Sequence, residues 1–505
     1  MHFLPHTVTQ SPLLAGLFLV LGVGACYYIS RGIYILYFHP LACFPGPKLW
    51  LVTPLPNARA LRRGKVLHRL REFHEQFGPV VRWSPNELSF IDSQGWRDIY
   101  GKQGARREFG RNPIWYPRAP NGAHNILSAD AASHARIRKL LSRGFSESAL
   151  REQERLIQQY VRLLVDRLRP LASSGREVSI GDYIMFATFD IAGELTFGEP
   201  FDCLAKEEVH PWVKVTLGFF KRIISIASLL MVFPYLRALL PYLVPKNIQE
   251  QSRERFAFST ARTGKRLELG EAAHRSDFVT YICRYNDDKG MSRKEIDATC
   301  DILISAGSET TATALSGTLQ YLFRNPECLR KLTEEVRSSI AADSDLTIQK
   351  TATLPYLGAV LQEGLRMAPP APSIRPRLVP EGGAHVCGHW LPAGTSVGVP
   401  SWSAFRSKRN FAQPDSFIPE RWLDEKQGGV ALEPHDNNAF MPFSYGPRDC
   451  LGRRLAWAEM RLILSSLIWH FDMVHTSPEY RWEDQVAFLL WEKKPLNVIL
   501  SNATR

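Results

Sequence analysis

The stretch Phe443-Ser-Tyr-Gly446-Pro-Arg448-Asp-Cys450-Leu-Gly452 places one cysteine between two glycines, directly before a run of helix-like sequence. Gly446 and Gly452 allow the backbone to approach another group closely. The amide groups at a helix start lower the pKa of a thiol, and a metal removes its proton outright. Arg448 can hold a carboxylate, and Phe443 can shield the sulfur from water. The stretch therefore predicts a thiolate that ligates a metal.

The remaining cysteines and the histidines narrow the choice of metal. No two of the eight cysteines form a CxxC pair, and no histidine lies close to Cys450 in the sequence, which argues against zinc. Haem needs only one protein ligand on one face. A nucleophilic cysteine served by a distant histidine is the functional alternative, and a small buried side chain is the structural one.

The fixed positions of the stretch match FxxGxRxCxG, the haem-binding signature of the cytochrome P450 family, and the chain resembles this family over nearly its whole length. The resemblance implies haem b (iron protoporphyrin IX) held by Cys450, with Phe443, Gly446, Arg448 and Gly452 around it. It implies the cytochrome P450 fold, mainly α with small β-sheets. The hinge of the chain, its C-terminal tail and the segment Leu195-Thr-Phe-Gly-Glu-Pro200 resemble those of fungal microsomal members that tailor secondary metabolites, such as the isotrichodermin C-15 hydroxylase type.

A second motif is Glu363-Gly-Leu-Arg366, which matches the ExxR motif of this family. Positions three apart share one face of a helix, and an exposed ion pair there would contribute little stability. The resemblance implies instead that the pair joins Arg421 of Pro419-Glu-Arg421-Trp in a buried structural network, in which the loss of one member is costly.

A third motif is Ala306-Gly307-Ser-Glu309-Thr310-Thr, which matches the oxygen-binding motif [AG]GxxT. A glycine inside a helix costs ~1 kcal/mol relative to alanine unless something needs the space. A patch of small residues for helix packing is the alternative. The resemblance implies that Thr310 and Glu309 are catalytic and deliver protons for dioxygen cleavage through ordered water.

Basic residues resemble those that bind the haem propionates in this family. His134 and Arg138 lie four positions apart, which places them on one helical face. Arg377 resembles the arginine that follows the ExxR helix, and Arg375 is an alternative because it lies so near. A solvated basic face is the alternative for the pair His134 and Arg138.

The N-terminus carries an uncharged apolar segment at residues 13–29. A helix needs ~20 apolar residues to span a bilayer, and flanking residues can extend this segment. A cleaved signal peptide is the alternative, but residues 1–12 hold no Lys or Arg. Basic residues follow the segment, which predicts a single-pass anchor with a cytosolic body. We expect an anchor at 1–38, a proline-rich hinge at 39–48 and the catalytic domain at 49–505; the microsomal resemblance implies the endoplasmic reticulum.

Periodicity predicts one large helical domain behind the hinge. Helices are expected at residues 149–168, 182–196, 294–323, 326–341, 354–367 and 450–469, and strands at 80–83, 88–91, 384–391, 396–399 and 496–500. The apolar stretch from Ile223 to Leu236 holds a proline and has two interpretations, a buried helix or a flap that dips into the membrane surface.

The composition and charge of the chain limit the kinds of partner that it can bind. The 505 residues are 45% hydrophobic and 22% charged, as in a globular protein, and the net charge of +12 favours an anionic membrane or an acidic protein. Basic residues are spread out, which argues against nucleic acid. Arg136 and Lys139 could receive an acidic reductase. No dinucleotide-binding fingerprint is evident. The resemblance implies that electrons come from NADPH through a separate cytochrome P450 reductase, with cytochrome b5 as a second candidate partner.

The predicted function is a reductase-dependent monooxygenase that hydroxylates, epoxidises or similarly oxidises a hydrophobic small molecule in fungal secondary metabolism. Two alternatives are a haem-thiolate isomerase or dehydratase that does not use O2, and a non-catalytic haem-binding protein. The intact Ala306-Gly307 and Thr310 argue against the isomerase. Apolar segments are expected to bind the substrate, namely residues 101–130, 219–243, 302–305, 371–374 and 486–489.

Overall fold

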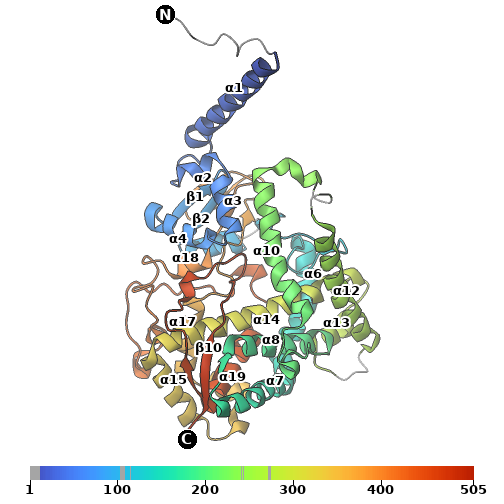
Figure 1. Ribbon diagram of the computed structural model, residues 1–505, viewed down its shortest axis with the longest axis vertical. Coiled ribbons are helices and arrows are strands. Elements are labelled where there is room, and N and C mark those ends of the chain that lie inside the picture. The colour runs from blue at the N-terminus through green and yellow to red at the C-terminus, as the bar shows by residue number, and fades with distance from the viewer. Residues whose placement is uncertain are drawn as a thin grey trace, which may run out of the picture.

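A long central helix organises the body of the protein (Figure 1). The computed structural model describes residues 12–102, 108–113, 115–239, 242, 244–270 and 275–504. Helix α14 (Arg293–Arg324) begins at a capping box in which Ser292 and Glu295 exchange hydrogen bonds, and it ends just before Pro326. It packs against α8 (Ile180–Phe197), α17 (Pro355–Met367) and α12 (Lys246–Glu268). This arrangement confirms the mainly helical fold.

The other α-helices of the described residues lie before and after α14 in the chain. Those of the N-terminal half are α1 (Pro12–Ile33), α2 (Lys48–Val52), α3 (Leu55–Arg62), α4 (Val66–Phe77), α5 (Gln94–Tyr100), α6 (Ala131–Leu141), α7 (Glu147–Ser174), α9 (Cys203–Lys206) and α10 (Pro211–Val232). Those that follow are α13 (Phe278–Tyr285), α15 (Pro326–Ser339), α16 (Ile348–Ala352), α18 (Ser401–Phe405) and α19 (Arg453–His470).

Three small sheets are present among the described residues. The five-stranded sheet has the order β1 (Val80–Ser84), β2 (Glu87–Phe90), β8 (Ser396–Gly398), β5 (Arg377–Leu378) and β3 (Gly110–Arg111). The three-stranded sheet has the order β4 (Glu177–Ser179), β10 (Asn497–Asn502) and β9 (Phe471–His475). The single strand expected at residues 384–391 is wrong: it is a hairpin of β6 (Ala384–Val386) and β7 (His389–Leu391), because Cys387 and Gly388 both adopt positive φ and turn the chain.

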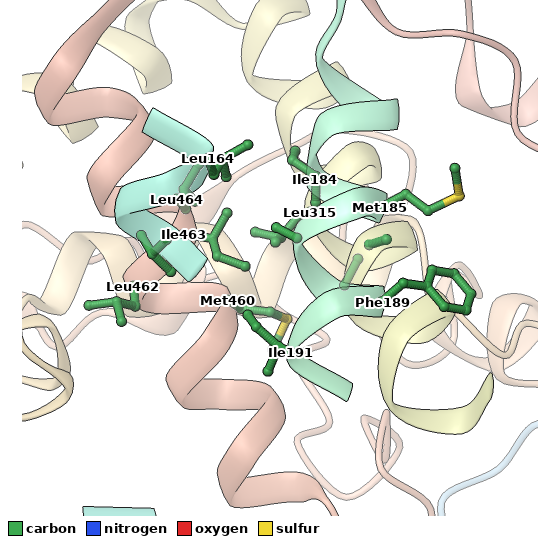
Figure 2. Close-up of a cluster of buried hydrophobic side chains, with 14 of the residues drawn as sticks. Leu164, Ile184, Met185, Phe189, Ile191, Leu315, Met460, Leu462, Ile463 and Leu464 are labelled. Atoms are coloured by element: carbon green, nitrogen blue, oxygen red, sulfur yellow. The ribbon is translucent and has the colours of Figure 1, made fainter. Parts of the chain in front are cut away.

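The main hydrophobic core fixes the central helices relative to one another. Figure 2 shows side chains of α7, α8, α14 and α19 packed together; Leu164, Ile184, Leu315 and Ile463 are fully buried members. Core side chains of this kind stabilise by about 1.5–3 kcal/mol each when fully buried. The helix that carries the oxygen-binding motif and the helix that follows Cys450 therefore share one rigid core.

Helix α1 projects from the body at one end (Figure 1). The span Ala15–Phe38 is long and apolar enough to cross a membrane and is almost wholly exposed. The segment behind it is packed onto β1: Leu41 is fully buried, the Arg82 amide donates to Pro45 O at 2.8 Å, and Arg82 Nη1 donates to Ile35 O at 2.9 Å. The expected hinge is therefore attached to the body.

The apolar stretch from Ile223 to Leu236 divides at its proline. Its first part belongs to α10 and buries Ile224 and Ala227, whereas a short 3-10 helix (Pro234–Leu239) follows and leaves Tyr235 exposed. The side chains of Ile223 and Pro234 lie outside the described residues. The first part is therefore a partly buried helix, and the second is an exposed apolar turn, for which insertion into a membrane surface stays a prediction.

Candidate active site

The loop that carries Cys450 is closed by backbone hydrogen bonds. The Cys450 amide donates to Phe443 O at 2.8 Å, and the Asp449 amide donates to Gly446 O at 3.1 Å. Gly446 has φ +79°, and a Cβ atom there would lie 2.1 Å from Tyr100 O, so only glycine fits. Helix α19 begins at Arg453, slightly later than expected, with Gly452 as its N-cap.

Cys450 is exposed, yet protein surrounds it closely enough that burial raises the pKa of its thiol. The backbone amide of Gly452 and the cations Arg453 and Arg138 act in the opposite direction and favour the thiolate. Such a side chain is protonated when free and is deprotonated by a metal, as expected for a ligand.

The middle of α14 borders open space. Ala306 is exposed although Ser305 and Ser308 beside it are buried, and a Cβ atom on Gly307 would meet nothing within 4 Å. The Thr310 hydroxyl donates to Ala306 O at 2.7 Å, while the helix runs on without a break. Space lined by small residues in a buried helix fits a ligand.

Glu309 lies on the neighbouring face of α14 and is buried. Its Oε1 atom lies 2.7 Å from the Nζ atom of Lys493, a residue near the C-terminus. Thr313 Oγ1 also donates to this oxygen, at 3.3 Å. The carboxylate is therefore held by a cation that the motif does not contain.

Cations gather beside the Cys450 loop. The register of β3 and β5 places Arg111 opposite Arg377, an unfavourable pair unless an anion lies near. Burial lowers the pKa of Arg111 to about 9, and Arg377 and Arg448 add to the effect. Burial lowers the pKa of His134 to about 3, again with nearby arginines, so its imidazole is neutral at pH 7.

Several donors of this cluster have no partner among the described residues. They are Arg111 Nε and Nη1, Arg375 Nε and Arg377 Nη1, all of them buried. A buried guanidinium group without a partner destabilises the folded state, so these atoms indicate the binding of an anionic ligand. The carboxylates of haem propionates would satisfy them.

Two of the arginines expected to bind the cofactor also bind the protein itself. Arg138 Nη1 donates to Asp449 O at 2.7 Å, and its Nη2 pairs with the Asp449 carboxylate. Arg448 Nη1 donates to Ala129 O at 2.8 Å, and its Nε pairs with Glu108. Both arginines therefore connect the Cys450 loop to α6 and to the segments before it.

Of the two residues expected to meet a reductase, Arg136 is engaged within the protein. It forms an ion pair with Glu295 at 2.6 Å, at the start of α14. Lys139 is exposed. Part of the expected substrate-binding segments, namely residues 103–107, 114, 240–241 and 243, lies outside the described part of the chain.

The ExxR motif is the centre of a buried charge network. Arg366 Nε and Nη2 donate to the two carboxylate oxygens of Glu363 at 2.8 and 2.7 Å, and Arg421 Nε donates to the same carboxylate at 3.2 Å. All three side chains are fully buried. Trp422 Nε1 adds a bond to Glu363 at 2.8 Å.

The residues present fit haem b: one deprotonatable thiol for the iron, unpaired guanidinium groups for the propionates, and open space along α14. Fold and site together define a haem-thiolate enzyme. The chain belongs to the cytochrome P450 family, whose sequence model, described as Cytochrome P450, matches residues 44–500.

Relatives cover nearly the whole chain. The cytochrome P450 monooxygenase astJ of Aspergillus oryzae is 41% identical over 470 residues, which is 92% of this chain and 93% of the relative. The cytochrome P450 monooxygenase lcsI of Purpureocillium lilacinum is 43% identical over 488 residues, 95% of this chain and 93% of the relative. The cytochrome P450 monooxygenase cpaH of Aspergillus oryzae is 39% identical over 487 residues, which is 96% of this chain and 94% of the relative.

The predicted class is thereby confirmed. The chain is a monooxygenase that uses haem b, and its electrons come from NADPH through a reductase. The isomerase and the non-catalytic haem-binding protein find no support. The narrower likeness to the isotrichodermin C-15 hydroxylase type stays a prediction.

Two residues of the site escape sequence reasoning. Arg111 joins the cation cluster only because a two-residue strand pairs with β5, and no periodicity marks so short a strand. Lys493 reaches α14 from a remote part of the chain. Arg111 is revealed by the pairing of β3 with β5, and Lys493 by its contact with Glu309 in the folded protein.

Proposed function

We propose that this monooxygenase oxidises a hydrophobic small molecule in fungal secondary metabolism. The observation that carries the proposal is the open space beside Ala306 and Gly307 in an otherwise buried helix. The small residues leave room for a bulky substrate, and the apolar segments expected to bind it suit a molecule of low polarity.

Haem b supplies, when bound, the iron centre that activates dioxygen. Cys450 is its proposed ligand, and the Gly452 amide and nearby arginines favour the thiolate. The proposed propionate ligands are His134, Arg138, Arg377 and Arg448, to which we add Arg111 and Arg375 because they carry unpaired donors. Phe443 and Gly446 shape the loop around the sulfur.

Thr310 and Glu309 are the proposed proton-delivery residues. The Thr310 hydroxyl donates to Ala306 O, so its oxygen remains free to accept a hydrogen bond from water. Glu309 is a buried carboxylate on the next position of the same helix and can exchange a proton. Glu363, Arg366 and Arg421 are structural in this scheme.

Membrane association is proposed for the end of the molecule from which α1 projects. Leu55 of α3 and Phe233, Tyr235 and Leu239 after α10 are large exposed apolar residues. Helices α3 and α10 pack together at this end (Figure 1). Such a patch next to an apolar anchor suits a bilayer surface. We propose an anchor at 1–38, a catalytic domain at 49–505 and a cytosolic orientation at the endoplasmic reticulum.

An acidic partner would meet basic residues near the Cys450 loop. Lys139 on α6 and Arg453 and Arg454 at the start of α19 are exposed. We propose this face for the reductase and for cytochrome b5, since complementary charge speeds association.

The experiment uses the full-length protein with reductase in vesicles. A panel of hydrophobic compounds is first screened for the change in the haem spectrum that substrate binding causes. Thr310→Ala should release most of its electrons as hydrogen peroxide, whereas Thr333→Ala should not. Thr333 is a matched control because its hydroxyl makes the same bond to the preceding turn, to Leu329 O at 2.8 Å, on distant α15. Product formation without NADPH would overturn the proposal. So would a Thr310→Ala variant that releases no more hydrogen peroxide than the wild type.

A further inference from the structure

A residue close to the C-terminus reaches the middle of the oxygen-binding helix. Lys493 Nζ lies 2.7 Å from Glu309 Oε1 and donates to Thr313 Oγ1 at 3.0 Å. Thr313 Oγ1 in turn donates to Glu309 Oε1. The side chains of Glu309 and Lys493 are 3% and 16% exposed, so water screens the pair only weakly.

The contacts on Glu309 are one-sided. Oε1 contacts the Lys493 ammonium and accepts from the Thr313 hydroxyl, whereas Oε2 is buried and has no partner among the described residues. A buried carboxylate oxygen needs a donor, which a water molecule or a proton can provide. One oxygen is thus fixed and the other is available for proton exchange.

The segment around Lys493 is itself held in place. The Glu492 amide donates to Val486 O at 2.9 Å, and the Lys494 amide donates to the buried Gln485 side chain at 2.8 Å. These bonds fix the backbone on both sides of Lys493. A cation on a fixed backbone can orient a carboxylate with little loss of conformational entropy.

We propose that Lys493 is a positioning residue for the monooxygenase reaction, which supplies the counter-charge of the Glu309 carboxylate, holds its Oε1 atom and directs its Oε2 atom toward the proton path. The inference rests on the proton-delivery role proposed above for Glu309. Lys493 contacts neither haem nor substrate in this scheme and acts through Glu309 alone.

The first test is independent of turnover. In Lys493→Met the buried carboxylate loses its cation and should take up a proton, because an isolated buried charge neutralises. Infrared difference spectra of the holoenzyme, variant minus wild type, should then show the carbonyl-stretch band of one additional protonated carboxyl. That band should disappear in the double variant Glu309→Gln/Lys493→Met and be absent from Lys493→Arg, which keeps the charge. A Lys493→Met spectrum without this band overturns the inference.

The second test measures hydrogen peroxide released per NADPH with a substrate found in the spectral screen. Lys493→Met should raise the ratio of peroxide to product on the order of tenfold, less than the loss of an acid–base group itself, because Glu309 remains. Lys493→Arg should restore coupling. Glu492→Gln is the matched control, since it breaks the neighbouring exposed ion pair with Lys221 and should change nothing.

The two levels of the hypothesis fail differently. If Lys493→Met releases no more hydrogen peroxide per NADPH than the wild type while Glu309→Gln releases much more, the inference about Lys493 is overturned and the role of Glu309 stands. If Glu309→Gln releases no more hydrogen peroxide per NADPH than the wild type, the role of Glu309 is overturned and, with it, that of Lys493.

Discussion

The amide of Cys450 and the carbonyl of Phe443 are joined by a hydrogen bond of 2.8 Å, which closes the loop around the sulfur. Arg138 of α6 donates to Asp449 O in this loop, and Arg448 of the loop donates to Ala129 O in the segment before α6. The thiol is thus presented by backbone geometry, and substitutions that deform the loop should affect ligation without touching the sulfur.

Gly446→Ala should destabilise the loop. The residue has φ +79°, and its new Cβ atom would lie 2.1 Å from the Tyr100 carbonyl oxygen, so strain and a backbone clash add. We expect a loss of about 2–3 kcal/mol in the free energy of unfolding and a lower haem content. Gly428→Ala is the control: φ is +82° there, but nothing lies within 4 Å. Equal losses in both variants, measured by urea denaturation, would contradict the close approach.

Glu363→Gln should be among the most damaging conservative changes. It leaves the guanidinium groups of Arg366 and Arg421 buried without their counter-charge. Breaking a buried ion pair by removing one partner costs about 3–5 kcal/mol. Arg330→Gln removes an exposed cation from two surface pairs and should leave thermal stability unchanged. A stable Glu363→Gln protein would disprove the structural role of the network.

Glu459 on α19 should make stability depend on pH. Burial raises the pKa of its carboxyl to about 8, and a hydrogen bond from Thr311 offsets only part of the effect. The folded protein therefore holds this proton more tightly than the unfolded chain does. The contribution is fully present below about pH 4.5 and is lost as the pH rises through about 8.

Glu459→Gln should accordingly stabilise the protein at pH 9 relative to the wild type and flatten its stability profile between pH 6 and 9. The exposed Glu479→Gln serves as the control. The measurement is the midpoint of denaturant unfolding at each pH. Parallel profiles for wild type and Glu459→Gln would refute the proposed protonation.

Truncation should separate the anchor from the hinge. Removal of residues 1–33 deletes α1 but keeps Ile35, whose carbonyl accepts from Arg82. This variant should leave the membrane fraction more readily and keep its stability. Removal of residues 1–47 also deletes the buried Leu41 and Phe44 and should cost about 3 kcal/mol or more. Equal thermal stability of the two variants would show that the hinge does not belong to the folded body.

The regular elements could be predicted because periodicity and local signals coincide. The capping box at Ser292 and Pro326 delimit α14 almost where the pattern of apolar residues does. The hairpin at residues 384–391 could not be predicted, since Cys387 has an unusual conformation for a non-glycine residue. Its turn depends on tertiary packing and not on propensity.

The residues of the candidate site also fall into those that the sequence predicts and those that it does not. Cys450, Glu363 and Thr310 lie in contiguous motifs, whose residues identify the chemistry on their own. Arg111 and Lys493 act through contacts between segments far apart in sequence, which the folded structure alone brings together. Arg138 and Arg448 are a third case: their motifs are visible in the sequence, but their contacts with Asp449 and Glu108 follow only from the folded structure.

The spectrum of the reduced, carbon monoxide-treated protein tests the central claim most directly. The full-length protein should show the Soret band of a thiolate-ligated haem. Cys450→Ser should lose that band, whereas Cys387→Ser, a change at another free cysteine, should keep it. A thiolate band that persists in Cys450→Ser, or a wild-type protein that takes up no haem, would contradict ligation by Cys450.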